Sequence, residues 1–550
     1  MYKEGDCRPL LTPEPSSESQ PAPSNKKALR NIENVTVPET ATYGRNITCA
    51  GAYILVMSQM IGCSIFATPG SIVRSTGSVG VTLLLWVVAA IVRACDLGIY
   101  TEYGCMLPRS GADKVYLEFT YRRPRFLAST LFAIASVALS VSATNCIVFG
   151  QYMLFALGME PTVASQRGFA VGLLLAVCII HGYFLKLGIR IQNFLGWVII
   201  SIVAFMISTG LYVVLFQKRP TIAGSPELLS WSGIWEGSNW EFGVLATSML
   251  QVSSSFSGLC TTNVVLNEVQ NPVRSVKVVG LLAFVTVCIL YALINVAYFM
   301  VVPIEEIKRS GQLVAALFFE RVFGPGFGKT VLPLLVAISA AGKVMVTVFT
   351  SARINQEIAR QGFLPFSRYL SSSEPFNTPL GGVVVHLIPS MLTILLPPPG
   401  DIYNFILDVQ GYPGEFFGIA ITFGIILLRW RRPELLRPFK TWLPSVWLRL
   451  VVGFLLIIAP FFPPHNGQGD VHFFYATYAI VGVGIIVLSV VYWWIWTVVI
   501  PNRNGYQLEE EVEILPDGTT NWIHGPDEEF YHIIHIPTPL EYQAASFRSA

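Results

Sequence analysis

The 550-residue sequence predicts an all-α membrane protein with about twelve transmembrane helices. Hydrophobic residues make up 53% of the chain and charged residues only 13%, a balance that excludes an ordinary soluble globular protein. Most of the chain consists of apolar runs of the ~20 residues that a helix needs to cross a bilayer. A formal net charge of +2, with no basic cluster, gives no indication of a nucleic-acid partner.

The apolar runs define the expected spans and leave two polar ends. The runs lie at about 49–73, 79–107, 126–156, 168–185, 191–216, 241–265, 276–302, 327–352, 380–397, 402–428, 446–463 and 473–500. Residues 1–45 are polar and rich in Pro, Ser and Glu, which predicts a disordered N-terminal tail. Residues 501–550 are expected to form a C-terminal tail.

The distribution of basic residues predicts the orientation. An even number of spans places both termini on the same side of the membrane. With the termini in the cytoplasm, the inner loops carry more than twice as many Lys and Arg residues as the outer loops. The positive-inside rule therefore predicts cytoplasmic tails for a multi-pass protein, which we expect in the plasma membrane.

The first span is interrupted at Ile61-Gly62-Cys63-Ser64-Ile65-Phe66. Gly62 and its small neighbours weaken the helix near mid-membrane, and Pro69-Gly70 follows one to two turns later. Such an interruption is tolerated only where the backbone is buried or lines a cavity. Broken midplane helices are typical of secondary transporters, where a half-helix N-terminus holds an anionic group. The alternative is a helix kinked at glycine for close packing.

The sixth span carries a second interruption. Between Gln251 and Cys260 the chain has three consecutive serines, 253–255, followed by Ser257 and Gly258. Small residues also occur where helices pack closely, which is the alternative here. The two interrupted spans are five spans apart, the separation of paired broken helices in a five-helix inverted repeat. Together the two interruptions favour transport.

Several motifs resemble those of the amino acid–polyamine–organocation superfamily. The stretch Ile61–Ser71 resembles its first-helix motif, and the segment Ser257–Pro272 resembles its sixth helix. Further similar motifs are Glu102, Pro108-Arg109-Ser110-Gly111 and Tyr116-Leu117-Glu118 in and after the second span, and Ser351-Ala352-Arg353 with Gly362-Phe363-Leu364-Pro365 after the eighth. Residues 116–126 and 145–149 are most similar to the fungal L-type and methionine permease branch. The resemblance covers residues 45–500.

The resemblance implies a leucine-transporter-type fold and a transport function. Five helices at about 49–216 and five at about 241–428 would form an inverted repeat with broken first and sixth helices. Peripheral helices at 446–500 would complete a transporter domain spanning 46–500. We expect a secondary-active amino acid transporter that works by alternating access, either proton-coupled or sodium-independent. The alternative is an amino acid sensor of the same fold that does not transport.

The resemblance and the physics of helix ends predict the substrate site. The substrate carboxylate would face the N–H groups of residues 63–65, at the positive end of a half-helix that begins near Phe66. The ammonium group would face carbonyls freed near Gln59–Ile61 and Ser254–Phe256. The expected binding residues are Ile61, Gly62, Cys63, Ser64, Ile65, Ser254, Ser255, Phe256, Ser257, Gly258 and Cys260. With no charged side chain among them, a neutral or apolar, methionine-like amino acid is expected.

The sequence departs from the family pattern at five positions. Ser64 replaces the usual second glycine, and Ser254 replaces a bulky aromatic gate. Leu259 and Cys260 replace the common Trp-Asn pair, and Ile199 stands where many members have a lysine in the fifth helix. These differences leave the substrate range and the coupling open.

Four charged residues inside the spans are candidates for coupling or gating. Arg93 and Asp96 share a helix face and can pair, with a functional or a structural role. Glu102 is either a proton-linked carboxylate or a structural anchor. Lys343, about 11 residues into the eighth span, could supply the cation missing at Ile199. It would carry a proton or occupy a sodium site; the alternative is a structural tie to Asp96 or to first-helix carbonyls.

Enzyme activity, cofactors and metal sites are not expected. No span carries a catalytic triad in order or a cluster of metal ligands. The nine cysteines show no zinc-like or redox spacing. A heavy-chain partner linked by a disulfide is also not expected, because residues 157–167 and the other predicted outer loops contain no cysteine.

Overall fold

The structure, a computed structural model, describes most of the chain between residues 47 and 525. The described ranges are 47–62, 64–139, 142–160, 162–216, 231–310, 313–360, 362, 364, 366–374, 376–396, 402–462, 474–504, 509–514 and 520–525. All of them belong to one compact unit. The expected N-terminal tail, residues 1–45, lies outside the described residues.

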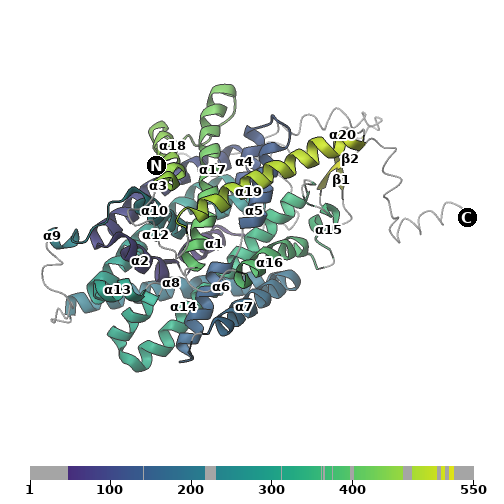
Figure 1. Cartoon of the computed structure of the whole chain (residues 1–550). Helices are drawn as coiled ribbons and strands as arrows, with labels where there is room; N and C mark the ends of the chain where they lie inside the picture. The colour runs from purple at the N-terminus through teal and green to yellow at the C-terminus, as the bar shows by residue number, and fades with distance from the viewer. Residues whose placement is uncertain are drawn as a thin grey trace, which may run out of the picture. The chain divides into compact units, whose positions relative to one another are not determined.

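The first half of the chain forms the helices of the first five expected spans (Figure 1). They are α1 (Cys49–Ile61), α2 (Ser64–Thr76), α3 (Val79–Met106), α4 (Asp113–Thr120), α5 (Leu127–Leu139), α6 (Ala143–Ala156), α7 (Val163–Tyr183) and α8 (Leu185–Phe216). The pair α1–α2 forms the first span and the pair α5–α6 forms the third. The short helix α4 lies in the connection after the second span.

The second half supplies the remaining spans. Its helices are α9 (Trp231–Ile234), α10 (Phe242–Ser255), α11 (Thr261–Val264), the 3-10 turn η3 (Leu266–Glu268), α12 (Pro272–Val301), α13 (Ile304–Ser310), α14 (Val314–Arg360), α15 (Ser367–Ser371), α16 (Leu380–Leu395), α17 (Ile402–Arg431), α18 (Leu443–Ile458), the 3-10 turn η5 (Ala459–Phe461), α19 (Thr477–Trp494), the π-helical turn η6 (Ile495–Val499) and α20 (Ile500–Asn504). The strands β1 (Glu509–Ile514) and β2 (Thr520–Gly525) follow.

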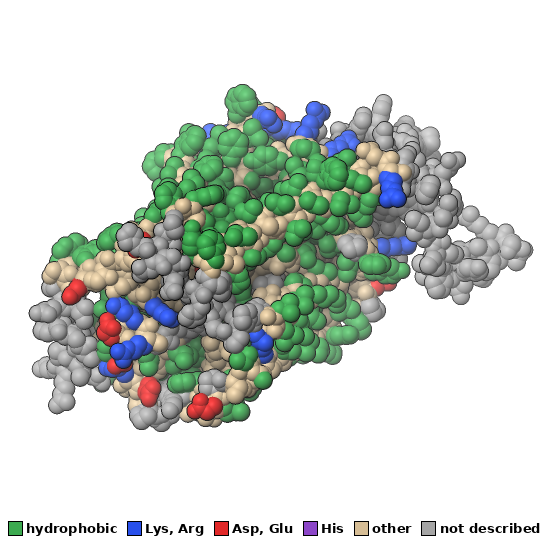
Figure 2. All heavy atoms as spheres, viewed as in Figure 1, with side chains coloured by type: hydrophobic (Ala, Val, Ile, Leu, Met, Phe, Trp, Pro, Cys, Tyr) green, Lys and Arg blue, Asp and Glu red, His purple; other side chains and the backbone are tan. Residues whose placement is uncertain are grey.

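Within the described residues, ten helices or helix pairs are long and apolar enough to cross a membrane. The shorter apolar helix α16 and the interrupted pair α10–α11 coincide with the two remaining expected spans. The structure is therefore an all-α membrane fold that is consistent with twelve spans. Hydrophobic side chains cover a broad central area of the face drawn in Figure 2, as expected for a surface in contact with lipid.

The interrupted first span occupies the interior, whereas the last spans lie outside. Seventy-one per cent of the most apolar part of α1–α2 is buried, against 6% for the span that begins with α19. Helix α14 packs against α1, α6, α8 and α16. This arrangement surrounds the first interruption with helices from both halves of the chain.

Two features differ from the expectation. The third span is also interrupted: the carbonyl of Leu139 accepts a hydrogen bond from Gln410, and the Ser142 amide donates one to Ser390 Oγ. Polar groups of α16 and α17 therefore satisfy backbone groups that the helix leaves free. In the expected C-terminal tail, β1 and β2 pair as an antiparallel hairpin.

Candidate substrate site

The first interruption is centred on Gly62. Helix α1 ends at Ile61, Gly62 has a φ of 43°, and α2 begins at Ser64. A side chain is strained at this φ, and a Cβ on Gly62 would lie 2.0 Å from Cδ of Lys343. Both the backbone conformation and the packing therefore require glycine. Cys63, one of the expected binding residues, lies outside the described residues.

The half-helix of the first span begins at Ser64, two residues before the expected Phe66. Its first N–H groups, from Ser64 onward, have no partner within the helix and form its positive end. On the other side of the break, the carbonyl of Gly62 accepts a hydrogen bond of 2.8 Å from Ser339. The carbonyl of Met60 accepts one of 2.7 Å from the hydroxyl of Tyr291. Donors on other helices therefore stabilise carbonyl groups that the break leaves without a partner in α1.

The second interruption lies directly against the first. Helix α10 ends at Ser255 and α11 begins at Thr261, and Gly258 between them has a φ of 97°. A Cβ on Gly258 would lie 2.2 Å from Cγ of Gln59 in α1. The Ser254 hydroxyl donates a 2.6 Å hydrogen bond to the Gln251 carbonyl of its own helix. Both predicted interruptions are thus present, and the two breaks are in contact.

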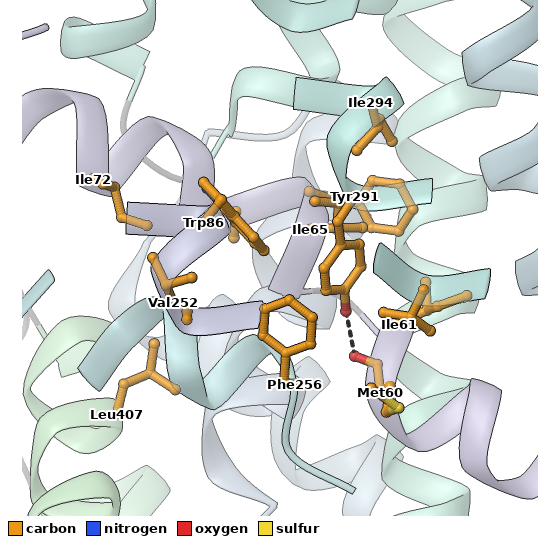
Figure 3. Packing of buried hydrophobic residues seen from close by; sticks show 14 of the residues in the cluster. Met60, Ile61, Ile65, Ile72, Trp86, Val252, Phe256, Tyr291, Ile294 and Leu407 are labelled. Carbon is orange, nitrogen blue, oxygen red and sulfur yellow. Dashed lines mark hydrogen bonds between the residues drawn. The ribbon is translucent and has the colours of Figure 1, made fainter. Parts of the chain in front are cut away.

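Tyr291 hydrogen-bonds to both breaks and packs against two further aromatic rings. Its hydroxyl contacts the carbonyl of Met60 and also lies 2.9 Å from the carbonyl of Ser255. Its ring centroid lies 5.2 Å from those of both Trp86 and Phe256 (Figure 3). Tyr291 could not be identified from the sequence, because one tyrosine in an apolar span shows no distinguishing pattern.

A cavity of about 470 Å³ opens beside the two breaks. Of the expected site residues, Ser64, Ser254, Phe256, Ser257, Gly258 and Cys260 line it, together with Lys343, Arg93 and Asp96. Ile61, Ile65 and Ser255 are buried and, like Gly62 and Glu102, are not among the residues that line it. The cavity also reaches Thr144 and Asn145 of α6 and Gln410 of α17, which the sequence analysis did not assign to the site.

Helix α14 braces the first break with three polar side chains four residues apart. Ser339 contacts the Gly62 carbonyl, Lys343 Nζ lies 3.1 Å from Ser64 Oγ, and Thr347 donates to the side chain of Gln59. Residues at this spacing lie on one helix face. Lys343 is only 5% exposed, so its ammonium group is held inside the protein beside the start of α2.

Lys343 and Ile199 lie on two helices that are in contact, α14 and α8. A Cβ on Gly342 would lie 2.7 Å from Cδ1 of Ile199, so α8 and α14 touch at this point. Ile199, where the resemblance leads one to expect a lysine, therefore contacts Gly342, the residue before Lys343.

Four charged residues on the cavity wall form a group that we call the charge ring: Arg93, Asp96, Glu415 and Arg449. All but Arg93 are buried. Arg93 lies 2.8 Å from Asp96, and Arg449 contacts Asp96 as well. Arg449 also lies 2.9 Å from Glu415, which is 3.7 Å from Arg93. The expected Arg93–Asp96 pairing is present. Glu415 and Arg449 carry no local signal in the sequence, because they are 34 positions from each other and more than 300 from their partners Arg93 and Asp96.

Glu102 lies at a different place from the charge ring. Its carboxylate contacts Arg429 and accepts a hydrogen bond of 2.8 Å from the Thr441 amide. It therefore ties the end of α3 to the connection between α17 and α18. Within the residues that the structure describes, no group of three or more His, Cys, Asp or Glu side chains is placed to hold a metal ion.

Two interrupted helices that meet beside a cavity with charged and hydroxyl side chains on its wall, in a fold of apolar spans, define a multi-pass membrane transporter. The sequence pattern of the family described as Amino acid permease matches residues 47–487. The chain belongs to this family. It is thus an integral membrane protein that transports an amino acid, and it is not an enzyme.

Individual relatives cover most of the chain. The high-affinity methionine permease of Saccharomyces cerevisiae is 34% identical over 483 residues, which are 86% of this chain and 82% of the relative. The low-affinity methionine permease of the same yeast is 30% identical over 493 residues, 88% of each chain. The b(0,+)-type amino acid transporter 1 of Homo sapiens is 26% identical over 440 residues, 79% of this chain and 86% of the relative.

Proposed function

We propose that this protein carries a neutral amino acid with an apolar, methionine-like side chain across the plasma membrane by alternating access. The observation that carries the proposal is the charge balance of the cavity wall. Where the substrate side chain would lie, the wall consists of the hydroxyls of Ser254 and Ser257, the thiol of Cys260 and apolar groups. Lys343 lies instead beside Ser64, at the proposed carboxylate site. The charge ring pairs two cations with two carboxylates. A neutral side chain fits this wall, and two relatives are named methionine permeases.

The substrate's head group binds at the breaks in this proposal. Its carboxylate accepts hydrogen bonds from the N–H groups at the start of α2 and from the Ser64 hydroxyl. Its ammonium group contacts carbonyls freed at the ends of α1 and α10, and its side chain extends towards Ser254, Ser257 and Cys260. The proposed binding set remains the eleven residues expected from the sequence, at positions 61–65, 254–258 and 260.

Lys343 is the residue we propose for coupling. Its ammonium group lies next to the start of α2, so it can respond to the charge of the bound carboxylate. Alternating protonation of the amine would couple transport to protons. A permanently charged lysine would instead take the place of a sodium ion and make transport sodium-independent.

The orientation is part of the same proposal. Both termini lie in the cytoplasm, because the loops on that side carry most of the Lys and Arg residues. The loop between α3 and α4, which the cavity reaches at Gly111–Asp113, then faces the cytoplasm.

Uptake into proteoliposomes tests this function. Labelled methionine should accumulate with saturable kinetics, and unlabelled neutral amino acids should compete better than arginine or glutamate. Preferential uptake of a charged amino acid would contradict the proposed substrate class. Saturable binding without accumulation would identify a sensor instead. Leu281→Ala, at a residue that is 56% exposed on α12, is the matched control for protein quality.

A further inference from the structure

Asp113 lines the cavity outside the charge ring, 17 positions after Asp96 in the sequence. It is the first residue of α4, in the connection after the second span, and it lines the cavity. Its side chain shares a hydrogen bond with Tyr100 of α3, which lines the same cavity. Arg93, Asp96 and Tyr100 are spaced three and four residues apart, so they lie on one face of α3. This face leads from the charge ring to Asp113.

The groups around Asp113 are acidic or neutral. Asp96 and Tyr100 face it from α3, Cys260 from the start of α11, and Tyr116 from its own helix. The neighbouring Lys114 turns away: its Nζ lies 3.7 Å from Glu357 and bonds to the Glu357 carbonyl. In the part of the chain that the structure describes, no Lys or Arg forms an ion pair with Asp113, whereas the carboxylates of the charge ring have two each.

This environment makes Asp113 easy to protonate. Burial raises the pKa of Asp113 to about 6, and the charge of Asp96 acts in the same direction. The hydrogen bond from Tyr100 opposes the shift, because it stabilises the ionised carboxylate. The group therefore changes its charge just below neutral pH.

We infer that Asp113, held by Tyr100, is a proton-binding site of the transport cycle, from which the proton leaves on the side of the α3–α4 loop. The inference rests on the proposed proton-coupled transport and orientation. In the release step the O–H bond of the protonated carboxyl group breaks and the proton passes to water in the cavity. The carboxylate that remains accepts the hydrogen bond from the Tyr100 hydroxyl.

A purely structural role for Asp113 makes a different prediction. A carboxylate in the first turn of a helix also stabilises the helix through its dipole. That effect changes stability and does not make transport depend on the proton gradient. The contact with Tyr100 and the position on the cavity wall distinguish the two roles, because neither is needed for a helix end.

Asp113→Asn removes the titrating group and keeps the shape of the side chain. In proteoliposomes of the full-length protein, accumulation driven by an inward proton gradient of about one pH unit should fall about tenfold, because one coupled proton supplies the free energy of a tenfold concentration ratio. Counterflow of labelled methionine without a gradient should stay within about twofold, because exchange needs no net proton movement. Asp113→Glu should restore part of the accumulation.

Tyr100→Phe changes the surroundings of Asp113 and leaves Asp113 itself in place. It therefore tests the same proton site even if the asparagine variant does not fold. The Tyr100 hydrogen bond lowers the pKa of Asp113, so its loss should raise that pKa. When the uptake rate is plotted against internal pH, the midpoint of the curve should therefore move upward by about one unit. Tyr121→Phe is the matched control, because the Tyr121 hydroxyl bonds to the Ala420 carbonyl and does not line the cavity.

The outcomes separate the inference from the proposed function. Folded Asp113→Asn protein with wild-type accumulation and pH dependence would overturn the inference while leaving proton-coupled transport intact. So would a Tyr100→Phe midpoint equal to that of the wild type. A wild-type protein without pH dependence would instead overturn the proposed proton coupling itself, and the inference with it, before any variant is measured.

Discussion

Lys343 in the eighth span donates a hydrogen bond of 3.1 Å to the hydroxyl of Ser64, the first residue of the half-helix α2. Two positive groups are thereby held together, the ammonium group and the N-terminal end of a helix. Their mutual repulsion falls when an anion binds beside them. The contact thus connects the proposed coupling residue to the proposed carboxylate site, and it makes both testable.

Replacement of Lys343 by Met should separate coupling from exchange. The variant keeps a long apolar stem in the space above Gly62 but has no titratable amine. We expect uptake to lose its pH dependence while counterflow exchange continues, both measured in proteoliposomes. Lys186→Met, at an exposed position of α8, is the control. Wild-type pH dependence in an active Lys343→Met protein would rule out the coupling role.

Replacement of Ser64 by Gly should weaken substrate binding. The Ser64 oxygen accepts a hydrogen bond from Lys343, so the hydroxyl proton can be donated to the substrate carboxylate. A hydrogen bond to a charged group contributes ~1.5–3 kcal/mol, which corresponds to a loss of at least about tenfold in affinity. Binding of labelled methionine to purified protein measures this. Tighter binding would show that the side chain crowds the site, and unchanged affinity would show that it does not touch the ligand.

Replacement of Gly62 by Ala should disrupt the first break. The φ of 43° opposes a side chain, and such backbone strain costs about 1–3 kcal/mol. The new Cβ would also lie only 2.0 Å from Cδ of Lys343. We expect a lower melting temperature in detergent and the loss of uptake. Gly172→Ala in α7 is the matched control, because a Cβ there meets nothing within 4 Å. Its helix should be slightly more stable, by up to about 1 kcal/mol. Equal behaviour of the two variants would contradict the assigned geometry.

Replacement of Arg449 by Met should destabilise the protein strongly. It would leave Asp96 and Glu415 buried with Arg93 as their only partner in the charge ring, and breaking a buried ion pair costs about 3–5 kcal/mol. The double variant Arg449→Met with Glu415→Gln restores neutrality and should recover part of the loss, as measured by melting temperature. Arg274→Met, at an exposed residue of α12, should have little effect. Without any recovery in the double variant, charge balance would not explain the stability of the ring.

Much of the fold and both breaks could be predicted from the sequence. A spanning helix is identified by the length of its apolar run, so the expected second span, 79–107, agrees within one residue with α3, Val79–Met106. The positions of Gly62 and Gly258 are local signals of the same kind, because a positive φ favours glycine wherever it occurs. The Arg93–Asp96 pair was also predictable, since the two residues are three apart on one helix.

What remained was decided by the tertiary structure. The third span is broken where Gln410 reaches the carbonyl of Leu139, and the sequence analysis assigned no break to the small polar residues that follow Leu139. Arg449 meets Asp96 across 353 positions of the chain, and Tyr291 meets Met60 across 231. Such contacts depend on which helix faces touch. The free energy of a buried charge or carbonyl depends on those neighbours, whereas the tendency to cross a membrane depends only on the local composition of the chain.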